Sequence, residues 1–152
     1  MENKHWILVG NSARASLYSR DAGRTSWQLT REAEFTQIDS RRKRSELTTD
    51  RAGAVRGHGN DSTHYVSRGD PKRSVAEHFA RDLASRLAQA LQQGKFARLS
   101  LVASNPFLAL LDAQLDPHLR KVLTGEVAHD YTQLKLPALQ TRLQELLSLP
   151  AH

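Results

Sequence analysis

The first 35 residues alternate between short apolar runs and polar turns. Residues 5–10, HWILVG, form a continuous apolar run, which is typical of a strand buried on both faces. A second strand is predicted over residues 14–20, RASLYSR. Residues 26–35, SWQLTREAEF, place apolar and polar side chains on alternate faces, and Arg31 is the one exception on the apolar face. Short turns join these runs, so the pattern predicts an antiparallel meander of three strands.

The apolar period changes at Pro71. From there the apolar residues recur at steps of four: Val75, Phe79, Leu83, Leu87 and Leu91. This stripe predicts a long helix that begins near Pro71 and is stopped by Gly94.

Three shorter elements and a last helix follow. Residues 97–103, ARLSLVA, predict a fourth strand. A helix is expected next, with Ser104 or Asn105 as its N-cap and Pro106 at its first position. Residues 124–134 predict a short fifth strand plus a loop, and Pro137 opens the last helix.

The expected order of elements is therefore β-β-β-α-β-α-β-α. Antiparallel strands followed by alternating helices and strands predict an α/β fold, a mixed five-stranded sheet with helices on its faces. This is the element order of the ribonuclease H-like architecture. The chain has 152 residues and no internal repeat, which predicts a single domain over residues 1–152.

Residues 36–70 interrupt this pattern, because they show no apolar period. Their centre is SELTTDRAGAVRGHGND, residues 45–61. A loop of this length inside a compact domain is uncommon, and usually carries function or is a disordered spacer. Both interpretations are open at the level of sequence.

Charge favours a functional interpretation. Residues 41–74 hold nine Lys and Arg against four Asp and Glu, so 9 − 4 = +5 of the net charge of +6 falls there. Clustered arginine is the electrostatic signature of nucleic-acid binding. The predicted RNA-binding residues are Arg41, Arg42, Lys43, Arg44, Arg51, Arg56 and Arg68, with Tyr65 positioned to stack on a base. The competing interpretation is a solvated basic loop without a ligand.

The same segment contains residues that favour turns. Gly53, Gly57 and Gly59 permit positive φ or a close approach of the backbone to a ligand, and Asp50 can accept hydrogen bonds from nearby amides. These four residues are predicted to shape the loop. Pinning of the loop base and direct contact with a ligand remain equal alternatives for Asp50 and Gly53.

Several classes of protein are disfavoured. Cysteine is absent, and no apolar run reaches the about 18 residues of a membrane span. The apolar run at residues 6–9 is too short for a signal peptide, so we expect a cytoplasmic protein. The first strand carries no acid for a two-metal nuclease, and His58, Asp61 and His64 are a weak zinc set. No metal and no cofactor is predicted.

Four stretches of the chain together resemble a known bacterial family, the proteins required for attachment to host cells. They are WILVGNSARASLY (6–18), SELTTDRAG (45–53), DPKRSVAEHFARDLA (70–84) and LVASNPFLALLDAQLDPHLRKVLTGEVAHDYTQL (101–134). That family is in turn similar to the middle domain of archaeo-eukaryotic peptide-chain release factors. The resemblance implies a ribonuclease H-like fold and contact with ribosomal or transfer RNA.

In the release factors a Gly-Gly-Gln tripeptide occupies the loop before the long helix, whereas this chain has Gly57-His58-Gly59-Asn60 there. Gly59 and Asn60 are therefore weak candidates for a degenerate catalytic tip, and turn formation is the alternative. The leading hypothesis is a non-enzymatic module that binds RNA or the ribosome. The alternative hypothesis is an interaction protein that acts, indirectly, in attachment to a host cell, and an esterase-like hydrolase is the third.

Overall fold

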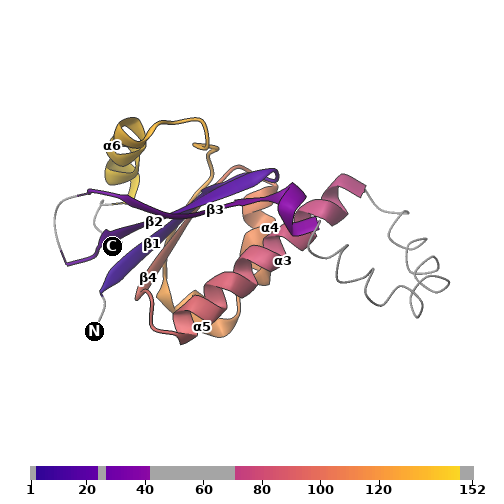
Figure 1. Ribbon diagram of the computed structural model, residues 1–152, viewed down its shortest axis with the longest axis horizontal. Coiled ribbons are helices and arrows are strands. Elements are labelled where there is room, and N and C mark those ends of the chain that lie inside the picture. The colour runs from indigo at the N-terminus through magenta and orange to yellow at the C-terminus, as the bar shows by residue number, and fades with distance from the viewer. Residues whose placement is uncertain (1–2, 24–26, 42–70, 148–152) are drawn as a thin grey trace.

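The computed structural model describes residues 3–23, 27–41 and 71–147 (Figure 1). The strands in these ranges are β1 (Lys4–Gly10), β2 (Arg14–Asp21), β3 (Thr30–Thr36), β4 (Arg98–Ala103) and β5 (Leu123–Val127). The helices are α3 (Pro71–Gln92), α4 (Phe107–Gln114), α5 (Pro117–Val122) and α6 (Leu136–Leu147). Their order along the chain agrees with the order expected from the sequence except between β4 and β5, where two helices, α4 and α5, stand in place of one.

The five strands form one mixed sheet with the order β3-β2-β1-β4-β5. β2 runs antiparallel to both of its neighbours, β1 and β3. β4 runs parallel to β1 on one side and to β5 on the other. The expected mixed five-stranded α/β sheet is thereby confirmed.

Helices cover both faces of the sheet, which explains the continuous apolar run of β1. α3, α4 and α5 lie on one face and α6 lies on the other (Figure 1). Leu8 belongs to the buried cluster under α3, whereas Ile7 and Val9 belong to the cluster under α6. Each fully buried aliphatic side chain contributes about 1.5–3 kcal/mol, so both faces of β1 must be apolar.

The predicted third strand was wrong in its extent and in its faces. β3 pairs Tyr18 with Arg31 and Leu17 with Ala33, so Glu32 is an extra residue in a β-bulge. A bulge moves every following side chain to the other face of the sheet. Trp27 and Leu29 therefore belong to the cluster under α6, whereas Ala33 and Phe35 pack against the cluster under α3.

The segment before β3 is held by a side chain instead of a neighbouring strand. The backbone N–H of Leu29 donates to Oε1 of Gln140 on α6 at 2.8 Å. This bond replaces a ladder partner, which is why the strand begins at Thr30. Arg31 is the last residue of the alternation that includes Trp27 and Leu29, because the bulge at Glu32 ends it.

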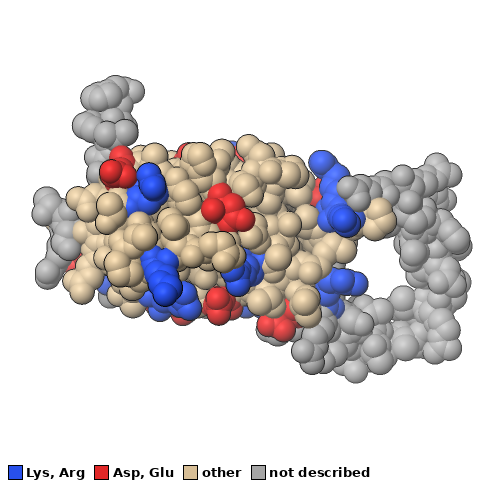
Figure 2. Space-filling model, turned by 90° about the horizontal axis from the view of Figure 1, so that it is seen from above, with Lys and Arg blue, Asp and Glu red and all other residues tan. Residues whose placement is uncertain are grey.

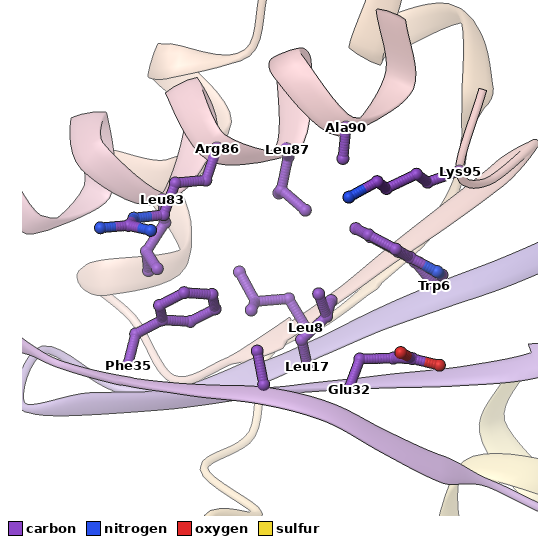
Figure 3. A pocket seen from close by; sticks show the side chains of 11 residues that line it. Trp6, Leu8, Leu17, Glu32, Phe35, Leu83, Arg86, Leu87, Ala90 and Lys95 are labelled. Atoms are coloured by element: carbon purple, nitrogen blue, oxygen red, sulfur yellow. The ribbon is translucent and has the colours of Figure 1, made fainter. Parts of the chain in front are cut away.

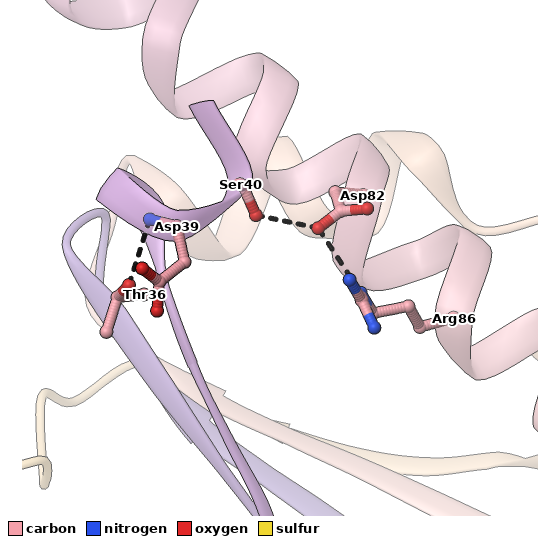
Figure 4. Close-up of polar contacts among 5 residues, drawn as sticks. All are labelled: Thr36, Asp39, Ser40, Asp82 and Arg86. Carbon is pink, nitrogen blue, oxygen red and sulfur yellow. Dashed lines mark hydrogen bonds and ion pairs between the residues drawn. The ribbon is translucent and has the colours of Figure 1, made fainter. Parts of the chain in front are cut away.

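The predicted loop over residues 36–70 begins later than expected. Thr36 still belongs to β3, and residues 37–41 form a helical turn. Oγ1 of Thr36 accepts a hydrogen bond from the N–H of Asp39 at 3.0 Å, and Oγ of Ser40 donates to Asp82 on α3 at 2.7 Å (Figure 4). A turn this short needs no apolar period, so periodicity could not detect it.

The long helix is confirmed, and the cap predicted for the following helix was wrong. Phe79, Leu83 and Leu87 are buried along α3, and Gly94 adopts φ +74 just after it ends. α4 begins at Phe107, after Pro106, without a side-chain cap. Ser104 instead contributes its carbonyl oxygen, which accepts from the N–H of Leu108 at 3.0 Å.

Candidate functional site

The best candidate site is a cavity at the carboxyl ends of β1 and β4. These two strands are parallel neighbours in the sheet. After β1 the chain turns back into the antiparallel strand β2, whereas after β4 it continues into the helix α4. Open α/β sheets bind ligands at such switch points. The cavity measures about 490 Å³ and is lined by Asn11, Ser12, Ala13, Lys72, Arg73, Ala76, Ser104, Asn105, Pro106, Phe107, Leu110 and Asp130.

One wall of this cavity is a turn organised by Asn11. Its Oδ1 accepts hydrogen bonds from the N–H groups of Ala13 at 2.8 Å and Arg14 at 3.0 Å. Its Nδ2 donates to Asp130 at 2.9 Å and to Thr132 at 3.2 Å. A single side chain therefore fixes the β1–β2 turn against the loop that follows β5.

The turn also depends on the absence of a side chain at Gly10. A Cβ atom there would lie 2.8 Å from Cβ of Ala15 and 2.9 Å from the carbonyl oxygen of Arg14. Both contacts are shorter than van der Waals separation, and one of them is to backbone. The close return of β2 beside β1 thus requires glycine at this position.

Asp130 supplies a negative charge to the same wall. Its Oδ1 accepts from the N–H of Thr132 at 2.9 Å and from Oγ1 of Thr132 at 2.6 Å. Burial alone would raise the pKa of this carboxyl, but the hydrogen bonds from Thr132 and Asn11 outweigh burial and hold the pKa below its ordinary value. Asp130 is consequently ionised at neutral pH, and its oxygens accept the hydrogen bonds from Asn11 and Thr132.

The opposite wall is cationic and comes from the first turn of α3. Lys72 and Arg73 are both exposed there, and Arg73 forms a 3.8 Å ion pair with the partly exposed Glu77. The first turn of α3 contains no acidic residue. The N-terminus of a helix carries partial positive charge, and Lys72 and Arg73 add two cations to it, so this wall of the cavity is cationic.

The N-terminus of α4 reaches the same cavity through Pro106 and Phe107. α4 has no side-chain cap, and of its first backbone N–H groups that of Leu108 donates to the carbonyl oxygen of Ser104. Two cations, two helix N-termini and Asn105 thus border one hollow, with the ionised Asp130, which accepts bonds from Asn11 and Thr132, on the facing wall. Such a combination suits the oxygen atoms of a phosphate group.

The sequence-predicted residues fall largely outside the described part of the chain. Arg41 is described, and it is exposed at the end of the helical turn 37–41. The following predicted residues lie outside the described residues: Arg42, Lys43, Arg44, Asp50, Arg51, Gly53, Arg56, Gly57, Gly59, Asn60, Tyr65 and Arg68. The same holds for His58, Asp61 and His64 of the weak zinc set.

Sequence reasoning missed the residues that line the cavity. Lys72 and Arg73 entered the charge count but were not identified as site residues, Asn105 was considered only as a helix cap, and Asn11 and Asp130 were not assigned to a site. One signal was present in the sequence. Asn11 and Asn105 each follow an apolar strand within two residues, and the structure makes those two strands parallel neighbours.

A second polar cluster lies at the opposite end of β1 and is buried. Arg20 donates from its guanidinium to Nδ1 of His5 at 3.2 Å, so Nε2 carries the proton and donates to Oγ of Ser100 at 2.7 Å. Oγ of Ser100 lies 3.1 Å from Oγ1 of Thr124. These bonds connect β2, β1, β4 and β5, which is a structural role.

A third cluster joins α4, α5 and β5. Arg120 donates to the carboxylate of Asp112 at 3.2 Å and to its backbone carbonyl at 2.6 Å. Burial and the neighbouring Asp112 raise the pKa of Glu126 to about 7, while hydrogen bonds from Glu126 and Arg120 lower the pKa of Asp112. The described residues contain no group of three or more His, Asp or Glu side chains that could hold a metal ion.

Comparison with known proteins identifies the family. Residues 6–143 match the family model described as "Protein required for attachment to host cells", and the chain therefore belongs to this family. The family expected from the sequence is thereby confirmed. None of the curated proteins compared with the chain matches it.

Solved structures extend the comparison to the fold. A structure described as "Archaeal protein" aligns with a TM-score of 0.50 and 12% identity, over 93% of this chain and 33% of that chain. The crystal structure of an archaeal translation termination factor, aRF1, aligns with a TM-score of 0.46 and 13% identity, over 87% of this chain and 32% of that one. This chain thus spans about a third of each, and at these identities the likeness concerns the fold alone.

No helix within the described ranges is long and apolar enough to cross a membrane.

Proposed function

We propose that this protein is a non-enzymatic RNA-binding module that associates with ribosomal or transfer RNA, on a ribonuclease H-like sheet of the release-factor middle-domain type. The observation that carries the proposal is the cationic wall of the cavity at the carboxyl ends of β1 and β4. Lys72 and Arg73 stand there beside two helix N-termini, where a phosphate group would be favoured.

The position of the basic segment supports the proposal. Residues 41 and 71 are the described ends of that segment, and the turn that contains residue 41 is tied to α3 by Ser40 and Asp82. Figure 2 places Lys and Arg side chains at the end of the molecule where α3 begins. The described chain on the two sides of that segment thus ends at residue 41, in a turn beside α3, and resumes at residue 71, directly before Lys72 of the cationic wall.

Transfer RNA binding and co-sedimentation with ribosomes, each measured across a salt series, test the proposal. Binding to RNA phosphates releases counterions, so log K falls linearly with log salt. The Lys72→Ala/Arg73→Ala variant removes up to two phosphate contacts, and we expect its slope to be shallower by about 1.4–1.8. Arg41/Arg42/Arg44→Ala tests the sequence-predicted part of the surface in the same assay.

A matched control removes the same charge elsewhere. Lys135 and Arg142 are exposed near and on α6, on the other face of the sheet. The Lys135→Ala/Arg142→Ala variant is expected to keep the wild-type slope. Absent or salt-insensitive binding by the wild type, or equal slopes for the two double variants, would contradict the proposal.

A second candidate function rests on the description of the family. A role as an interaction protein in attachment to host cells follows from that description and is compatible with RNA binding if attachment depends on it indirectly. Complementation of a deletion strain with Lys72→Ala/Arg73→Ala separates the two. If the variant loses both RNA binding and adhesion, attachment depends on RNA binding. If the variant loses RNA binding but restores normal adhesion, attachment depends on another surface of the protein.

A further inference from the structure

A second cavity, of about 340 Å³, lies between α3 and the strands β1, β2 and β3 (Figure 3). Its floor is apolar and buried, and consists of Leu8, Leu17, Leu83 and Leu87. The cavity arises at the β-bulge of the edge strand, where the side chains of Ala33 and Phe35 remain only partly buried. It opens on the α3 face, away from the cavity at the carboxyl ends of β1 and β4.

Aromatic rings wall this cavity at both ends. The Trp6 ring stacks on Phe96 with centroids 4.6 Å apart, and Trp6 itself remains half-buried. At the other end the guanidinium of Arg86 lies 5.2 Å from the centroid of the Phe35 ring. Volume and lining are those of a small-molecule pocket, which is concave, mostly apolar and bordered by a few polar groups.

Three charged side chains border the cavity, and two of them are already engaged. Nε of Arg86 donates to Asp82 at 3.3 Å, and Glu32 accepts a hydrogen bond from Oγ of Ser19 at 2.5 Å. The Lys95 ammonium has no ion-pair partner among the described residues, and Figure 3 shows its Nζ reaching toward the cavity. Lys95 is placed there because Gly94, at φ +74, turns the chain back after α3.

We propose that this cavity binds a small amphipathic monocarboxylate, with its apolar tail on the leucine floor and its carboxylate against Lys95. A neutral head group would forgo this ion pair, and a cationic head group would be repelled by Lys95. Glu32 lies on the same border and opposes a second negative charge on the ligand. The site is separate from the proposed RNA surface and does not depend on it.

Three probes with the same tail isolate the head group: octanoate, octanol and octyltrimethylammonium, each titrated by calorimetry below the concentration at which it aggregates. Octanoate is expected to bind most tightly and the ammonium least. Two-dimensional NMR locates the site, because Trp6 lines this cavity whereas Trp27 lies in the cluster under α6. Octanoate should move the indole signal of Trp6 and leave that of Trp27 in place.

Two substitutions of opposite sign test the charges. Lys95→Gln is expected to weaken octanoate binding by about fivefold, as an exposed ion pair of about 1 kcal/mol implies, with no change for octanol. Glu32→Gln is expected to strengthen octanoate binding, and Lys135→Gln serves as a control on α6's side of the sheet. Equal affinity for all three probes, no binding of octanoate, or a response at Trp27 instead of Trp6 overturns the proposal.

Discussion

At the scale of single residues, the buried His5 shows how a side chain's surroundings set its charge. Burial, and to a lesser extent the neighbouring charges of Arg20 and Arg98, together lower the pKa of His5 from 6.5 to about 4. His5 is only 5% exposed and accepts the hydrogen bond from Arg20 at Nδ1. A proton on that nitrogen would break the bond, so the neutral ring belongs to the folded state.

The stability of the protein should therefore depend on pH through His5. Between pH 6.5 and about 4 the unfolded chain binds a proton at His5 that the folded chain does not bind, so stability falls as pH falls through this window. The expected loss is on the order of 3 kcal/mol by pH 4. Urea unfolding of the wild type and of His5→Gln at pH 7, 5.5 and 4 measures it.

The His5→Gln variant is the necessary comparison, because carboxylates such as Asp130, whose pKa is lowered in the folded chain, also make stability fall in acid. The difference between wild type and variant isolates the contribution of His5. This difference should change with pH between 6.5 and 4 and stay constant above pH 7.5. A pH-independent difference would show that His5 titrates alike in the folded and unfolded chains.

At the scale of elements, the contact between α3 and the helical turn 37–41 rests on one carboxylate. Asp82 accepts from Oγ of Ser40 at 2.7 Å and from Nε of Arg86 at 3.3 Å (Figure 4). Ile38 within this turn is 63% exposed, so the turn has little apolar burial of its own. Polar contacts therefore hold the point where the chain enters the basic segment.

Replacing Asp82 with Ala should loosen this turn selectively. Loss of the hydrogen bond is expected to cost about 1 kcal/mol locally, which corresponds to about fivefold faster amide exchange over residues 37–41. Glu77→Ala is a matched control, because it removes the other i,i+4 ion pair of α3 without touching the turn. Hydrogen exchange followed by NMR measures both, and equal exchange in the two variants would refute the role of Asp82.

At the scale of the whole molecule, one sheet serves two separate cores. The cluster under α3, α4 and α5 and the cluster under α6 use alternate residues of the same strands. α6 contributes only Leu139 and Leu143 as buried side chains. Because the strands are shared, loss of the smaller core should weaken the larger one as well.

Leu143→Ala is expected to lower the free energy of unfolding by about 3 kcal/mol, since Leu143 is fully buried. Leu146→Ala on the same helix should cost less than about 1 kcal/mol, because Leu146 is 37% exposed. Urea unfolding followed at the indole signals of Trp6 and Trp27 reports the two faces separately. Their transitions should coincide in the variant, and a transition confined to Trp27 would mean that the cores unfold independently.

Local pattern by itself determined most of the elements. The apolar run of β1 and the stripe of Phe79, Leu83 and Leu87 on α3 reflect periods of two and 3.6, which depend only on neighbouring residues. The family could also be identified, because its four stretches are contiguous in sequence. The order of elements and the mixed sheet followed from these local signals.

Only the tertiary structure decided what lies together in space. The bulge at Glu32 depends on pairing with β2, and periodicity within one strand cannot show which residue of a partner is skipped. The candidate site brings Asn11, Lys72, Asn105 and Asp130 together from four separate parts of the chain. The parallel pairing of β1 with β4 brings Asn11 and Asn105 together, and the packing of α3 and of the loop after β5 adds Lys72 and Asp130; no local pattern of side chains encodes these long-range contacts.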